Sequence, residues 1–259
     1  MASAPQASLP LFYNDLMPLN SRDHGTWRAK SLTTAPWLKG QHAIPLTVEE
    51  FPQAQRFYPV IFSSGDNPVP LALMGLNEGV NVFVDDEGKI DTPVYIPAYV
   101  RRYPFVFATD DAQDRMVLCI DRAAEFIVEG GEMPFFEADN QPSDYTKRCM
   151  EFCNNFETER RRTVAFVQIL KDLDLFETKT ATFTPTNPDG TPAETQKIAE
   201  YFGVSEEKLN KLPPEKFIEL RDNGALGQIY AHLMSLVGWD RLVALAMARA
   251  PAPPQAANA

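Results

Sequence analysis

Cysteine is scarce in this chain of 259 residues, which has only Cys119, Cys149 and Cys153. An odd number of cysteines, two of them four residues apart on an expected helix, makes a poor disulfide framework and is typical of a reducing compartment. The opening residues, MASAPQASLP, lack a basic segment followed by an apolar one, so they do not predict a secretory signal. We therefore expect a cytoplasmic protein.

Long hydrophobic runs are also missing. Charged residues interrupt every apolar stretch well before it reaches the length of a membrane span, so we expect no membrane insertion. The net charge of −11 and the isoelectric point near 4.8 argue against nucleic acid and anionic lipid surfaces as partners. Hydrophobic residues make up 44% of the chain, which is enough for a sizeable globular core.

Local catalytic and metal-binding signatures are absent. The sequence contains no glycine-rich phosphate loop, no GxSxG, no HExxH and no calcium-loop spacing, and the catalytic residues therefore stay unassigned. Cys149 and Cys153 share a helical face and, with His232 or His42, offer thiolate and imidazole ligands that suit zinc. Both cysteines lie on the apolar stripe of that helix, however, where a free cysteine acts as a small hydrophobic residue. We expect neither a metal nor a cofactor.

The N-terminal half, residues 11–141, is rich in proline and in short strand-like segments. Alternating or continuous apolar runs predict strands over 58–63, 69–76, 80–84, 94–100, 105–108, 115–120 and 126–128. Asp85-Asp86-Glu87-Gly88 has turn chemistry, and so has the polar stretch 110–114. Thr47 is placed to cap a short helix through Glu49 and Glu50. Residues 1–10 and 250–259 are rich in alanine, proline and glutamine, and we expect them to be disordered.

The C-terminal half, residues 142–249, has helical patterning. Ser143 is a good N-cap, and apolar residues then recur at steps of three and four as far as Leu170. After an irregular β-type excursion over 177–192, shorter helices are predicted behind Ser205 and Pro213, and a last one over 225–249. We therefore predict an α+β fold in which a β-rich N-terminal half packs against a helical C-terminal half, as one integrated domain or two tightly packed ones.

The densest set of recognition-prone side chains lies in segment 95–105. Arginine supplies a planar fork that matches carboxylate or phosphate, and tyrosine supplies flat amphipathic surface. The candidate binding residues are Tyr95, Tyr99, Arg101, Arg102 and Tyr103. Adjacent residues on a strand point to opposite faces, so only one of the two arginines is expected to face any given pocket. The alternative is that one arginine pairs with an internal carboxylate such as Asp121 while the other is solvated.

Several segments resemble the bacterial SapC family. The most specific is the stretch YIPAYVRRYPF at 95–105. The others are YPVIF at 58–62, NVFVD at 81–85, LCID at 118–121 and IYAHLMSL at 229–236. They follow the order of the family and together span about residues 20–245.

The resemblance implies an accessory role rather than a reaction. Members tend to be encoded near TonB-dependent receptors, tryptophan-halogenase-like proteins and cupin-like proteins, a context that suggests nutrient uptake or surface modification. Our leading hypothesis is a non-enzymatic binding protein that recognises a protein, a peptide or a small anionic ligand through segment 95–105. One alternative is an enzyme of uncharacterised type acting on a peptide or amino-acid-related substrate. A second is the surface-layer component that the family name suggests.

Overall fold

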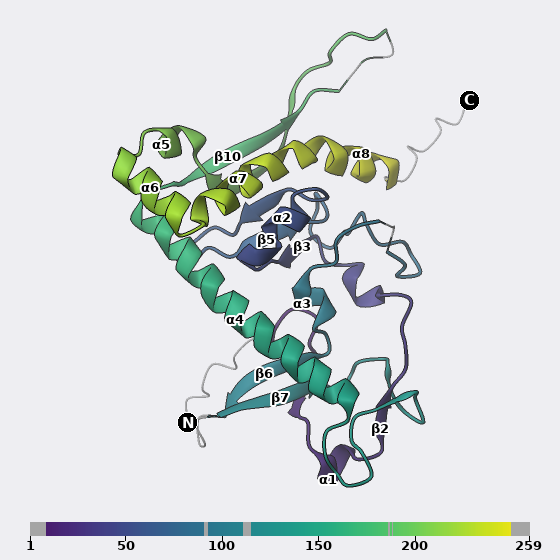
Figure 1. The fold of residues 1–259 in the computed structure, drawn as a ribbon. Helices are drawn as coiled ribbons and strands as arrows, with labels where there is room; N and C mark the ends of the chain where they lie inside the picture. The colour runs from purple at the N-terminus through teal and green to yellow at the C-terminus, as the bar shows by residue number, and fades with distance from the viewer. Residues whose placement is uncertain (1–8, 91–92, 111–114, 186, 188, 250–259) are drawn as a thin grey trace, which may run out of the picture. The chain divides into compact units, whose positions relative to one another are not determined.

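The chain is described by a computed structural model over residues 9–90, 93–110, 115–185, 187 and 189–249. Its contacts divide it into two compact units. The first unit combines Met1–Thr34 with Ala98–Arg160, and the second combines Ala35–Pro97 with Arg161–Ala259. Each unit is therefore assembled from two separate stretches of chain, and each is described below by itself (Figure 1).

The first unit contains two small antiparallel sheets. One has the strand order β1-β7-β6, from Leu16–Pro18, Arg115–Asp121 and Phe105–Asp110. The other has the order β8-β2-β9, from Ile127–Glu129, Trp27–Ala29 and Met133–Pro134. Two four-residue helices, α1 and α3, complete the unit together with the first part of α4; they span Ser21–His24 and Ala98–Arg101.

The long helix α4, Asp144–Asp172, begins where the sequence predicts it. The Ser143 hydroxyl accepts a hydrogen bond from the Thr146 N–H at 3.2 Å, which satisfies one of the free amides of the first turn. Its N-terminal turns pack Cys153, with Tyr145 and Cys149 beside it, against the core of the first unit. That core is a cluster of buried side chains from both sheets and the loops between them: Ala29, Phe105, Leu118, Ile120, Ala124, Phe126 and Phe135.

The second unit is built on a five-stranded antiparallel sheet of order β10-β11-β4-β5-β3. These strands are Phe176–Phe183, Gln196–Val204, Val60–Phe62, Pro70–Leu73 and Ala43–Pro45. The hairpin β10–β11 is joined to β4 at a single register pair, Phe202 with Phe62, and most of its length extends beyond the other strands (Figure 1). The predicted β-type excursion is thus a paired hairpin with a register shift between Ala181 and Thr182, and it is longer than expected.

Short helices surround this sheet. They are η1 Pro36–Leu38, η2 Val48–Glu50, α2 Phe51–Ala54, α5 Glu206–Asn210, α6 Pro214–Asp222, α7 Ala225–Ser235, η3 Leu236–Gly238 and α8 Trp239–Arg249. The predicted caps are confirmed: Thr47 and Glu50 form a capping box, and Ser205 accepts from the Lys208 N–H. Helix α7 packs on β4 and β11, and α8 packs on β10. The α+β class predicted from the sequence is confirmed.

Three sequence expectations about individual elements are wrong. Residues 80–84 form no strand, because the Asn81 side chain accepts from the Phe83 N–H at 2.9 Å and turns the chain locally. Residues 94–100 also form no strand and lead into α3. The last helix is not continuous, since η3 separates α7 from α8. Of the ends expected to be disordered, 1–10 and 250–259, residues 1–8 and 250–259 lie outside the described residues, and so do residues 111–114 of the turn expected over 110–114.

Candidate functional site

The arginine pair lies at the end of a helical turn. Pro97 precedes α3, and a proline has no N–H for a strand ladder while its fixed φ suits the start of a helix. The Arg102 N–H then donates to the Ala98 carbonyl at 3.0 Å, which continues the turn. Arg101 and Arg102 are therefore not on opposite faces of a strand. Arg101 is exposed, whereas only 7% of Arg102 is accessible.

The structure brings together four of the five predicted binding residues. Tyr99, Arg101, Arg102 and Tyr103 all belong to the first unit, and Tyr95 belongs to the second. There the Tyr95 hydroxyl donates to Glu50 Oε1 at 2.9 Å, and the Tyr95 carbonyl accepts from the Tyr58 hydroxyl at 2.7 Å.

Arg102 is a buried cation between two aromatic rings. Its Cζ lies 4.2 Å from the ring centroid of Tyr99 and 4.3 Å from that of Phe156. Such cation–π contacts stabilise the guanidinium, but they use none of its N–H groups. The nearest carboxylate is Glu157, whose Oε1 is 3.9 Å from Nη1, and Nε has no hydrogen-bond partner. The donor capacity of Arg102 is thus incompletely used, a situation that is costly for a buried charge.

The internal carboxylate beside the buried arginine is Glu157 and not Asp121, which the sequence alternative gave as its example. The buried carboxylate of Asp121 accepts from the backbone N–H groups of Asn14, Asp15 and Ala123 at 2.9–3.1 Å. The Tyr103 hydroxyl adds a fourth bond at 3.2 Å. Hydrogen bonds from backbone amides stabilise a buried carboxylate, just as a nearby cation would. Asp121 is therefore stabilised without an arginine partner.

A pocket of about 170 Å³ lies beside Arg102 within the first unit. Residues from α3 and the chain after it form one wall, and one face of α4 forms the other; the lining residues are Arg101, Arg102, Tyr103, Phe105, Tyr145, Arg148, Cys149, Phe152 and Cys153. Arg148 is exposed and pairs with no described carboxylate, and the guanidinium of Arg101 lies 5.2 Å from the Phe152 ring centroid. Three arginines therefore surround one small cavity.

Nothing else that lines the pocket carries charge at neutral pH. Burial raises the pKa of the Cys149 thiol to about 11 and that of the Cys153 thiol to about 12, so both stay protonated. Burial likewise raises the pKa of Tyr145. Protonated thiols are poor nucleophiles and poor metal ligands. Among the described residues, no three or more His, Cys, Asp or Glu side chains are grouped so as to hold a metal ion.

His232, which the sequence offered as a possible metal ligand, is fully engaged in the second unit. Its Nδ1 bonds to the Val60 carbonyl at 2.7 Å, and its Nε2 accepts from the Val204 N–H at 3.0 Å. Burial lowers its pKa to about 4, so the ring is neutral. With both nitrogens occupied, this histidine is a structural residue.

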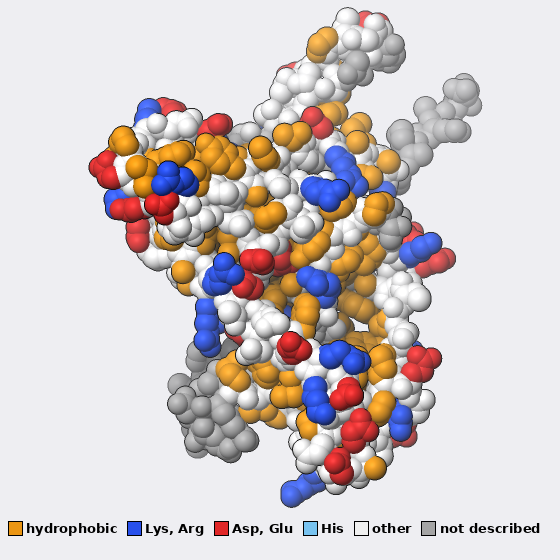
Figure 2. Space-filling view, in the orientation of Figure 1, with side chains coloured by type: hydrophobic (Ala, Val, Ile, Leu, Met, Phe, Trp, Pro, Cys, Tyr) orange, Lys and Arg blue, Asp and Glu red, His pale blue; other side chains and the backbone are white. Residues whose placement is uncertain are grey.

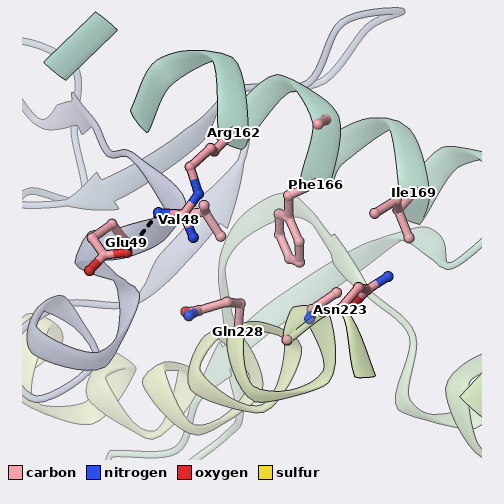
Figure 3. Close-up of a pocket in the computed structure, with 10 residues that line it drawn as sticks. Val48, Glu49, Arg162, Phe166, Ile169, Asn223 and Gln228 are labelled. Carbon is pink, nitrogen blue, oxygen red and sulfur yellow. Dashed lines mark hydrogen bonds and ion pairs between the residues drawn. The ribbon is translucent and has the colours of Figure 1, made fainter. Parts of the chain in front are cut away.

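A second pocket, of about 300 Å³, lies in the second unit between α4 and the start of α7 (Figure 3). Phe166 and Ile169 point into it from α4, and Gln228 faces them from α7. Its cation, Arg162, already pairs with Glu49 at 3.4 Å, and both side chains are largely exposed. Its cation is thus paired, whereas in the first pocket the Nε of Arg102 has no hydrogen-bond partner.

The comparison with protein families identifies the chain. The SapC family model matches residues 19–242 of the 259, and the chain therefore belongs to the SapC family. The comparisons with curated proteins and with solved structures gave no match. Helices long and apolar enough to cross a membrane are absent from the described part of the chain.

Sequence reasoning missed half of this pocket. Arg148, Phe152 and the two cysteines come from α4, more than forty residues after Arg102 in the chain. The available signal was that Tyr145, Arg148, Cys149 and Phe152 recur at helical spacing, which places them on one face.

Proposed function

We propose that this SapC-family protein is a non-enzymatic binding protein for a small anionic ligand that carries a carboxylate or a phosphate group. The observation that carries the proposal is the buried guanidinium of Arg102, whose Nε has no hydrogen-bond partner, lining a pocket with Arg101 and Arg148. Tyr103 completes the binding set, and Tyr99 holds Arg102 in place.

The energetics favour an anion over a neutral ligand. A buried cation is costly unless it is paired and hydrogen-bonded. Glu157, at 3.9 Å, is near the limit of an ion pair with Arg102 and too far for a hydrogen bond. An oxyanion in the pocket would receive charge-assisted hydrogen bonds, which are worth about 1.5–3 kcal/mol each. The neutral thiols and Tyr145 add no competing negative charge.

The size of the pocket limits the ligand. Sites for drug-sized molecules are about 300–1,000 Å³. At about 170 Å³, this cavity suits a small organic acid, inorganic phosphate or the charged end of a larger molecule. The accessory role in uptake or surface modification that the family context suggests is compatible with such a ligand.

We also place the protein in the cytoplasm. The three cysteines are free, and two of them are buried. Their raised pKa values keep the thiols protonated and therefore unreactive. Unreactive free thiols suit a compartment where disulfides are rare. Fractionation of the native host, with detection only at the cell surface, would contradict this assignment.

The test is calorimetric titration of the full chain with inorganic phosphate, pyruvate and benzoate in turn. We expect at least one to bind, and Arg101→Ala or Arg148→Ala to weaken that binding about tenfold or more, as the loss of one charge-assisted contact requires. Lys147→Ala is the matched control, because Lys147 is an exposed cation on the same helix that does not line the pocket. If none of the three anions binds at millimolar concentration, or if the control weakens binding equally, the proposed site is wrong.

Native mass spectrometry of protein purified gently from its own host gives an independent reading. A retained anion would be identified by its mass and then titrated against the same variants. A stoichiometric protein partner with no small molecule would instead favour recognition of an anionic group on that partner.

A further inference from the structure

Helices α7 and α8 carry a continuous exposed seam. It consists of residues spaced alternately by three and four positions, and every one of them is exposed: Gly227, Tyr230, Met234, Val237, Arg241, Ala244 and Ala248. This spacing is that of the a and d positions of a coiled coil, and the residues remain exposed across η3, which separates the two helices. We call this set the outer seam.

The outer seam is apolar although it faces outward. Val237 is 81% exposed and Met234 is 65% exposed. On the opposite side of the same helices, Ile229, Leu242 and other apolar residues are buried. A helix that is hydrophobic all round is normally buried on all sides, so a second element is expected to cover the outer face. Figure 2 shows hydrophobic side chains along this side of α7 and α8.

Arg241 is the single charged member of the outer seam. Its guanidinium lies 5.9 Å from the Phe57 ring centroid and 5.8 Å from that of Phe83, and Arg56 lies 5.5 Å from the Phe57 ring. Neither arginine forms an ion pair with a described carboxylate. Asp240 is exposed beside the seam but does not belong to it. The covering element must therefore offer apolar surface at the centre and something that accepts a cation at one end.

We propose that a second copy of this chain covers the outer seam, with its own α7–α8 antiparallel to the first about a two-fold axis between Met234 and Val237. In this register Met234 lies opposite Val237 of the other copy, and Tyr230 lies opposite Arg241. Gly227 then meets Ala244, so that small residues face each other where the backbones must approach.

The chemistry of these pairs is what selects a second copy over other occupants. In a two-fold interface residue i contacts j and j contacts i, so a single axis brings apolar residues together at the centre, small residues together where the backbones approach, and Tyr230 against Arg241. Tyrosine opposite arginine gives a cation–π contact at both ends of the interface. A parallel arrangement would instead place Arg241 against Arg241, which is repulsive.

The test is the mass of the full chain in solution, measured by light scattering after gel filtration. We expect twice the monomer mass of 29.0 kDa for the native chain and a twofold drop for Val237→Asp. Val164→Asp is the matched control, since Val164 is 59% exposed on α4 and lies outside the seam, and it should remain a dimer. Circular dichroism of each variant establishes that it is folded.

Two further variants test the antiparallel register. Tyr230→Glu places a carboxylate opposite Arg241 of the other copy and should keep the dimer, whereas Tyr230→Lys places a second cation there and should give monomer. A native chain that is monomeric overturns the proposal, and so does a dimer that survives Val237→Asp. Equal behaviour of Tyr230→Glu and Tyr230→Lys overturns the antiparallel pairing. None of the substituted residues lines the arginine pocket, so anion binding by these variants can be measured independently of their oligomeric state.

Discussion

His232 makes the free energy of unfolding of the second unit depend on pH. The ring joins the Val60 carbonyl on β4 to the Val204 N–H at the end of β11, two strands that share one register pair. In the second of these bonds the Val204 N–H is the donor and the neutral Nε2 is the acceptor. Protonation of Nε2 would remove that acceptor, so the folded state holds the ring neutral, and burial lowers its pKa to about 4.

The size of the effect follows from the two pKa values. In the unfolded chain a histidine titrates near pH 6.5, so below this pH the unfolded state binds a proton that the folded state does not. Stability contributed by His232 is therefore present above pH 6.5 and is lost as the pH falls toward 4. Each unit of pKa difference is worth about 1.4 kcal/mol, which gives a loss of about 2 kcal/mol at pH 5 and about 3 kcal/mol in full.

The assay is urea unfolding of the native chain and of His232→Gln at pH 7, 6 and 5. The variant should be less stable at pH 7 by about 1–3 kcal/mol, because one buried backbone group loses its partner. Between pH 7 and pH 5, the free energy of unfolding of the variant should also fall by about 2 kcal/mol less than that of the native chain. Ser235→Ala is the control, since it removes the hydroxyl bonded to the His232 carbonyl at 2.6 Å yet keeps the imidazole. Equal pH dependence in the native chain and His232→Gln would refute the reasoning.

Three other perturbations follow from the packing. Gly75→Ala should destabilise the chain by about 3 kcal/mol in urea unfolding, the upper end of the usual cost of overpacking, because its Cβ would lie 1.8 Å from the Val80 carbonyl oxygen; a free energy of unfolding equal to the native one would contradict this. Glu50→Gln should cost about 1–3 kcal/mol in the same assay, because Glu50 accepts from Thr47 and from the Tyr95 hydroxyl, and an amide nitrogen in either place accepts nothing; unchanged stability would exclude that role. The fragment 11–141 should not fold alone, because it lacks the α4 residues of the first-unit core, and a well-dispersed amide spectrum would show otherwise.

The sequence predicts the parts of this fold that have local causes. The long helix α4 has a cap at Ser143 and many turns of regular spacing, and the Thr47–Glu50 capping box is contained in four residues. Short apolar runs are different, because a strand and a single helical turn look alike over five residues. That is why 94–100 was expected to be a strand although it leads into α3, and why the side chain of Asn81 was not expected to divert 80–84.

In the candidate site, too, only the features that depend on neighbouring residues in the sequence could be predicted. The arginine fork chemistry pointed to Arg101 and Arg102 directly from the sequence. Their different exposure could not be predicted, since it depends on Tyr99 and Phe156, which enclose Arg102 from two separate helices. Arg148 has no local signature at all, and only tertiary structure brings it to the pocket.

The interleaved make-up of the two units imposes an order on synthesis. As the chain leaves the ribosome, strands β3, β4 and β5 are the first strands of the second unit to appear, but β11 and α7 follow only after residue 160, when every residue of the first unit has been made. Until then one edge of β4 is unpaired, and the Val60 carbonyl lacks its hydrogen bond to His232. Such an edge is a template for mispairing. Nascent chains stalled after residue 160 has left the ribosome and before β11 has left it should therefore be protected from protease over 98–160 and sensitive over 43–73, so strands made early in synthesis are among the last to gain their full set of partners.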